Sequence, residues 1–151
     1  MTRREVREVT FMMLFQLEFG SDISIDDTLA QYYTIDADST DADESTVTVD
    51  LAKSDRKYIE KVVNGVKEKT SELDAVIEKY SKGWSIERII KVDLALLRYG
   101  IYEMTYMSKQ TPVAVSINEA VELSKKYGTD KSKAFVNGVL SSYYKALKGE
   151  N

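Results

Sequence analysis

Three arginines lie close together near the N-terminus, at Arg3, Arg4 and Arg7. On a helix, positions 3 and 7 are one turn apart and position 4 lies beside them, so the guanidinium groups would gather at one helix end. Each guanidinium can bind a phosphate through two hydrogen bonds. The competing interpretation is a solvated helix face on which Glu5 and Glu8 pair with the arginines. The residues alone favour the solvated face.

A second basic group precedes the last helical pattern of the chain. Lys131 and Lys133 lie at its start, and Lys125 and Lys126 lie one loop earlier. A helix N-terminus attracts phosphate through its free amides, and lysines there add to the attraction. Phe135 follows, and its ring could either stack on an unpaired RNA base or pack in the core. Both roles of Phe135 remain open.

Acidic residues also occur in a central helical segment, at Glu87, Asp93 and Glu103. Pairs of carboxylates can perform acid–base catalysis, but no nucleophile or metal-ligand spacing accompanies these three. Glu87 and Lys91 have the spacing of an ordinary helix ion pair. Structural roles are therefore the default interpretation.

The composition excludes several classes of chemistry. The 151 residues contain no cysteine and no histidine, which excludes disulfides, thiolate chemistry, imidazole bases and the usual zinc sites. We therefore expect no enzyme, no catalytic residue, no metal site and no cofactor. No apolar run reaches about 18 residues, and the N-terminus resembles no secretory signal, so we expect a cytoplasmic protein without a membrane segment.

The net charge of −4 hides an uneven distribution. Residues 36–50 carry six acidic side chains and no lysine or arginine, so that segment has a charge of −6 and the rest of the chain has +2. An acidic protein can thus present a basic face to RNA. We interpret residues 36–52 as an acidic loop.

Hydrophobic periodicity predicts helices throughout the rest of the chain. We expect them over residues 3–19, 24–33, 54–83 with a restart at 71, 85–107 with a division near 91–93, 116–127, and from 130 or 132 onwards. The expected N-caps are Ser24, Ser54, Asp93 and Ser116, the last in a capping box with Glu119. Six or seven helices joined by short loops predict an all-α compact bundle, a single domain over residues 1–151.

The last two helices carry the most detailed expectations. Gly128 should end the first of them in a left-handed conformation. Gly138, inside the second, should cost about 1 kcal/mol relative to alanine, so we expect a close helix crossing there. The buried stripe of the last helix should comprise Phe135, Val136, Val139, Leu140, Tyr143 and Leu147.

Four segments occur in an order that resembles the NusB family of transcription antitermination factors. They are RREVREVTFMMLFQLEF at 3–19, WSIERIIKVDLALLRYGIYEM at 84–104, INEAVELSKKYG at 117–128 and FVNGVL at 135–140. The resemblance covers nearly the whole chain, except for a weak region at about 21–52. It implies the NusB arrangement, in which two helical halves share one core.

The resemblance also implies a function. It implies a non-catalytic adaptor that binds boxA-type single-stranded RNA together with NusE, a small-subunit ribosomal protein. The adaptor would join the antitermination complex on RNA polymerase and promote processive transcription, notably of ribosomal RNA operons. Family members occur as monomers or dimers, so a homodimer is possible. The alternative is a stand-alone helical protein–protein adaptor, or an accessory domain related to RNA cytosine methyltransferases.

The resemblance assigns RNA contact to both basic segments. At the N-terminus it favours RNA contact over the solvated face. It also assigns RNA contact to the segment TDKSKAF at 129–135. The implied RNA-binding residues are Arg3, Arg4, Arg7, Lys131, Lys133 and Phe135. Family members often have an acidic residue where Lys131 stands, so this chain departs from the common pattern there.

The same resemblance assigns a partner surface and a structural arginine. It places Glu87 and Asp93 where the family contacts NusE. Arg98 lies in the family's Leu-Arg motif, and we expect it to form an internal ion pair or a cap.

Overall fold

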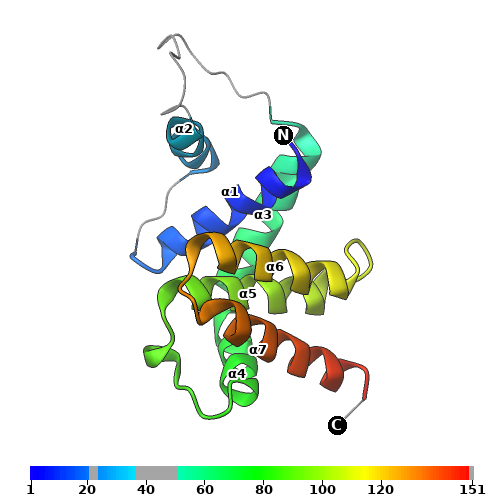
Figure 1. Ribbon diagram of the computed structural model, residues 1–151. Helices are drawn as coiled ribbons and strands as arrows, with labels where there is room; N and C mark the ends of the chain where they lie inside the picture. The colour runs from blue at the N-terminus through cyan, green and yellow to red at the C-terminus, as the bar shows by residue number, and fades with distance from the viewer. Residues whose placement is uncertain (21–23, 37–50, 150–151) are drawn as a thin grey trace. The chain divides into compact units, whose positions relative to one another are not determined.

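The computed structural model describes residues 1–20, 24–36 and 51–149, which form seven α-helices, one 3₁₀ helix and no strand (Figure 1). The all-α prediction is confirmed. In chain order the helices are α1 (Arg3–Leu17), α2 (Ile25–Asp36), α3 (Lys53–Glu68), α4 (Thr70–Tyr80), η2 (Ile86–Arg88), α5 (Lys91–Tyr106), α6 (Val113–Tyr127) and α7 (Ser132–Leu147). Of the acidic segment expected at 36–52, residues 37–50 lie outside the described residues.

The chain divides into two compact units, Met1–Val63 and Asn64–Asn151, and the division falls within α3. The single domain expected over residues 1–151 stays a prediction.

In the first unit, α1 packs against α2. Its buried apolar side chains include Val9, Phe11, Leu14 and Leu29. A salt bridge of 2.8 Å between Arg56 and Asp26 connects the start of α3 to α2. The predicted cap of α2 is confirmed, because the Oγ atom of Ser24 accepts a hydrogen bond of 3.1 Å from the amide of Asp27.

In the second unit, α5 is buried on nearly all sides, as expected of a central helix. It contacts α4, α6 and α7, and Figure 1 shows α5, α6 and α7 packed side by side. Arg98 on α5 binds Asp74 on α4 through two hydrogen bonds, from Nε at 2.8 Å and from a terminal nitrogen at 2.9 Å. The internal ion pair expected for Arg98 is confirmed.

Several predicted helix starts are wrong. Helix α5 begins at Lys91 with Ile90 as its N-cap, so Asp93 is the third helical residue and caps nothing. Helix α6 begins at Val113, because Pro112 has the fixed φ that suits a helix start, and Ser116 is buried within the helix instead of capping it. Helices α3 and α4 likewise begin one residue before the serines expected at 54 and 71.

The structural roles of the glycines differ from those predicted. Gly128 has a φ of −94°, so it is not left-handed. A Cβ atom there would overlap the side chain of Ser132 and lie 2.7 Å from the carbonyl oxygen of Ser124, so the space admits only hydrogen. At Gly138, a Cβ atom would have nothing within 4 Å, so no described helix crosses closely there. The close approach is at Gly100, where a Cβ atom would lie 3.0 Å from Leu140.

The stripe predicted for the last helix is also partly wrong. Val136, Val139, Leu140 and Tyr143 are buried, as expected, but Leu147 is 48% exposed. Leu147 is the final residue of α7, where no neighbouring turn covers it.

Candidate nucleic-acid interface

The first turn of α1 is closed by its own side chains. The amide of Glu5 donates to Oγ1 of Thr2 at 3.2 Å, and the amide of Thr2 donates to Oε1 of Glu5 at 3.0 Å, which is a complete capping box. The hydrogen bond from the backbone of Thr2 holds the pKa of Glu5 below its usual value, helped by the Thr2 hydroxyl. A carboxylate of the chain therefore already occupies the anion position at this helix end.

The three arginines of α1 do not have equal access to solvent. Arg3 and Arg4 are exposed, whereas Arg7 is only 9% exposed. Glu8 is buried to the same extent. The structure therefore does not present three exposed guanidinium groups at one helix end. Arg3 and Arg4 reach solvent, while Arg7 is mostly withdrawn from it.

The first turn of α7 is built differently. No side chain caps the helix at Lys131, whose own amide donates to Oγ1 of Thr129 at 3.3 Å. The Oγ atom of Ser132, which is fully buried, accepts a hydrogen bond of 2.9 Å from the amide of Thr129. Lys131 and Lys133 are both exposed. This turn thus combines two exposed ammonium groups with a helix end at which no side-chain capping hydrogen bond is formed.

A buried carboxylate lies beneath this turn. Asp93 on α5 is 6% exposed, and the hydroxyl of Ser132 hydrogen-bonds to its carboxylate. Burial raises the pKa of Asp93, and the hydrogen bond from Ser132 partly offsets the increase. Within the described part of the chain, Oδ1 of Asp93 has no hydrogen-bond partner. Asp93 therefore connects the starts of α5 and α7 and offers little surface to a second protein.

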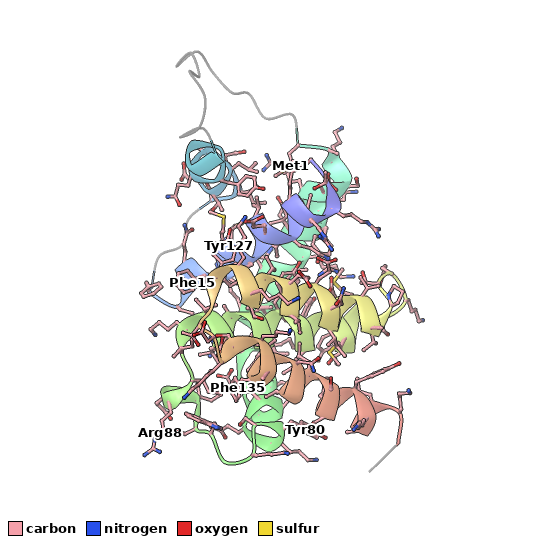
Figure 2. All side chains as sticks on the ribbon, viewed as in Figure 1. Met1, Phe15, Tyr80, Arg88, Tyr127 and Phe135 are labelled. Atoms are coloured by element: carbon pink, nitrogen blue, oxygen red, sulfur yellow. The ribbon has the colours of Figure 1, made fainter. Side chains whose placement is uncertain are left out.

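An aromatic pair lies on the same part of the second unit. The ring centroids of Phe135 on α7 and Trp84 are 6.0 Å apart, and the rings meet edge to face at 65°. Phe135 is half-buried, and Trp84 is 50% exposed. Figure 2 shows Phe135 on α7 and Arg88 projecting outward from η2.

Trp84 was not among the candidate residues predicted from the sequence. The signal available in the sequence is that it is the single tryptophan of the chain and directly follows Gly83 in a break between two helical patterns. A large aromatic side chain in a turn is more exposed than one on a helical stripe.

The remaining charged candidates are dispersed. Lys125 is engaged by Glu122 at 2.9 Å, and the ammonium of Lys126 lies 5.4 Å from the ring centroid of Tyr127. Glu87 is exposed on η2, so it is not on the same helix as Lys91 and the predicted helix ion pair is wrong in its geometry. Glu103 is 1% exposed inside the second unit.

Neither a metal-binding cluster nor a membrane-spanning helix occurs in the described residues. Over residues 1–20, 24–36 and 51–149, no three histidine, cysteine or acidic residues are grouped so that they could hold a metal ion. In the same residues, no helix has the length and apolar character needed to cross a membrane.

Comparison with protein families gives a match to the NusB family over residues 4–145. The chain belongs to the NusB family. The transcription antitermination protein NusB of Acetivibrio thermocellus is 43% identical over 148 residues, which cover 96% of this chain and 90% of that protein. The family is one of transcription factors named for antitermination, which agrees with the expectation that the chain is not an enzyme.

Two solved structures extend the comparison. T. maritima NusB has a TM-score of 0.74 and 33% identity, covering 96% of this chain and 92% of its own. The second is the NusB fold in a crystal structure of antitermination factors NusB and NusE in complex with dsRNA. It has a TM-score of 0.69 and 26% identity, covering 95% of this chain and 96% of its own. The expected NusB fold is therefore confirmed.

Proposed function

We propose that this protein binds boxA-type single-stranded RNA together with NusE, within the antitermination complex on RNA polymerase in the cytoplasm. It promotes processive transcription, notably of ribosomal RNA operons. The observation that carries the proposal is the likeness of the chain to NusB in a solved complex with NusE and RNA. Membership of the NusB family over residues 4–145 supports it.

The first turn of α7 supplies the stronger part of the proposed RNA surface. Lys131 and Lys133 are exposed beside a helix end without a capping side chain, and Phe135 is half-buried one turn into the helix. Lysines bind phosphates by releasing counterions, and an aromatic ring adds stacking with an unpaired base. Lys131 adds a positive charge where relatives often carry an acid, so it strengthens the attraction of RNA.

The start of α1 supplies a second proposed contact, through the exposed Arg3 and Arg4. Guanidinium groups bind phosphate in a bidentate manner, which needs no free helix amides. Arg7, because it is buried, contributes to the stability of α1 more than to phosphate binding.

Of the two acids proposed for NusE binding, Glu87 has the better position. It is exposed on η2, whereas Asp93 is buried against Ser132. We therefore propose that Glu87 contacts NusE directly. Asp93 contributes by connecting the start of α5, the helix that follows η2, to Ser132 at the start of α7.

A gel-shift titration with a boxA oligoribonucleotide, with and without NusE, tests the function. We expect RNA affinity that rises when NusE is added and falls steeply with salt, and a scrambled oligoribonucleotide of equal length should bind more weakly. NusE capture without any change in RNA affinity would show a protein–protein adaptor and would refute the proposal. Light scattering of the same samples gives the number of protein chains in each complex.

Two variants separate the RNA surface from the NusE surface. Glu87→Lys should impair NusE capture, since charge reversal at an interface brings like charges together, and it should leave binary RNA binding intact or slightly stronger. Lys131→Asp should lower RNA affinity and preserve NusE capture. Calorimetry for NusE and gel shifts for RNA provide the measurements. Loss of the same activity in both variants would disprove two separate surfaces.

A further inference from the structure

The turn that carries Trp84 is held in an unusual backbone conformation. Lys82 has a φ of 55° and Gly83 a φ of 93°, and Lys82 is the only residue other than glycine with positive φ in the described ranges 1–20, 24–36 and 51–149. A lysine in the left-handed region is uncommon and costs free energy, so the surrounding structure must hold it there. The Oγ atom of buried Ser81 does so by donating to the carbonyl oxygen of Trp84 at 3.1 Å.

This turn leaves half of the indole in water. Trp84 is 50% exposed, although burying an aromatic side chain of this size is normally worth several kcal/mol. Its partner Phe135 meets it edge to face, at an interplanar angle of 65°. In this arrangement, the ring that contributes its edge keeps both faces clear of its partner. An exposed aromatic surface therefore remains for a flat ligand.

Positive charge accompanies the aromatic pair. The amide of Phe135 donates to the carbonyl oxygen of Lys131 at 3.2 Å, so the two residues are one helical turn apart on the same side of α7. Lys131, Lys133 and Lys82, the neighbour of Gly83 in the turn, are all exposed. Stacking surfaces next to ammonium groups are the usual means by which proteins bind single-stranded nucleic acid. An apolar peptide would use the rings but not the charges.

We propose that Trp84, held in place by its edge-to-face contact with Phe135, forms a stacking platform for one unpaired RNA base, while Lys131 neutralises the adjoining phosphate. This inference rests on the proposed RNA-binding function and adds Trp84 to the residues of that site. The left-handed turn at Lys82 and Gly83 presents the indole, and α7 presents the phenyl ring and the ammonium group.

The single tryptophan makes the platform directly observable. Titration of the full-length protein with a boxA oligoribonucleotide should quench the indole fluorescence, with the same midpoint as the gel shift. A series of oligoribonucleotides, each with one abasic nucleotide, retains the phosphates and removes one base at a time. Quenching should be lost at one position of the series and kept at the others.

Substitutions provide a second test of the stacking platform. Trp84→Ala should weaken RNA binding by about 5- to 150-fold, the range for loss of one stacked base, and Trp84→Phe should recover most of the affinity. Phe19→Ala is the matched control, since it removes another exposed aromatic ring, 60% exposed in the first unit, and should leave affinity unchanged. Circular dichroism and thermal melting verify that each variant is folded. If Trp84→Ala unfolds, the abasic series with the unmodified protein still tests whether a base stacks on Trp84.

The outcomes separate the inference from the function on which it rests. A normal gel shift with unchanged fluorescence, or equal quenching by every abasic oligoribonucleotide, would overturn the stacking platform and leave RNA binding standing. Quenching by NusE in the absence of RNA would identify a protein-binding surface and would also overturn it. Absence of any RNA binding would overturn both proposals.

Discussion

The first turns of α1 and α7 are both basic, but they differ in whether a side chain of the protein caps the helix end. In α1, Thr2 and Glu5 close a complete capping box, and Glu5 occupies the position that an anion would take. In α7, no side chain caps the helix at Lys131. The same kind of charge pattern in the sequence thus produces one helix end that a capping box closes and one that has no side-chain cap.

The difference has a consequence for how each segment could bind RNA. Under the proposed function, phosphate binding at α1 would depend on long, exposed arginine side chains, because Glu5 occupies the helix end. At α7, the proposed contact would combine the helix end, two lysines and an aromatic ring. Each helix start also contains a buried polar residue: Arg7 in α1, and Ser132, which is hydrogen-bonded to Asp93, in α7. Proximity in sequence to an exposed basic residue therefore does not identify a ligand contact.

The largest expected effect is on stability, at Arg7. Replacing Arg7 with alanine should destabilise the protein by about 3 kcal/mol, since Arg7 is buried and takes part in an interaction that alanine cannot make. Arg3→Ala, at an exposed position of the same helix, should change stability by less than about 0.5 kcal/mol. Urea denaturation measures both. Equal small losses would show that Arg7 belongs with the exposed arginines.

The next effect concerns the turn before α7. Gly128→Ala should destabilise by about 2 kcal/mol, because the added methyl group would overlap the side chain of Ser132 and crowd the carbonyl oxygen of Ser124. Gly138→Ala is the matched control: open space surrounds it within α7, so it should stabilise the helix by up to about 1 kcal/mol. Thermal melting compares the two. A stable Gly128→Ala variant would mean that Ser132 moves freely and does not anchor the turn.

A smaller effect tests whether both turns contact RNA. Arg3→Ala with Arg4→Ala, and separately Lys131→Ala with Lys133→Ala, should each lower the slope of log affinity against log salt by about 1.4, for two lost phosphate contacts. Between about 50 and 200 mM salt this slope change corresponds to roughly sevenfold in affinity. Lys109→Ala, at an exposed position after α5, is the control. A pair whose replacement leaves the slope unchanged does not contact RNA.

The smallest effect is a pH dependence of opposite sign in the two regions. The pKa of Glu5 is lowered from 4.5, so its contribution to stability is present above pH 4.5 and is lost as pH falls through its folded-state pKa. The pKa of Asp93 is raised from 3.8, so its contribution is present below pH 3.8 and is lost as pH rises through its folded-state pKa. Glu5→Gln should therefore cost more stability at pH 7 than in acid.

Asp93→Asn should show the reverse trend, being better tolerated at pH 7 than in acid, because asparagine stays uncharged and still accepts a hydrogen bond from Ser132. Urea midpoints of the unmodified protein and both variants, taken at intervals from pH 3 to pH 7, measure the two trends. Parallel pH profiles for the two variants would contradict the different environments of these carboxylates.

The sequence by itself determined what depends on local pattern. The periodic apolar residues predicted an all-helical chain, Ser24 and Asp27 predicted the start of α2, and four ordered segments identified the family before the fold was known. The ion pair of Arg98 was also predictable in kind, since a charged residue on a largely apolar helix needs a partner. Its identity, Asp74, was not predictable, because the partner comes from another helix.

Only the tertiary structure decided which residues of each promising segment face water. Arg3 and Arg7 have the same chemistry and lie on one helix, yet one is exposed and the other buried. Asp93 was expected to cap α5, but the fold buries it and brings Ser132, from a helix far along the chain, within hydrogen-bond reach. The contact between the rings of Trp84 and Phe135 forms only in the folded chain. Burial and partnership are set by residues that are distant in sequence and near in space, and a local pattern carries no information about them.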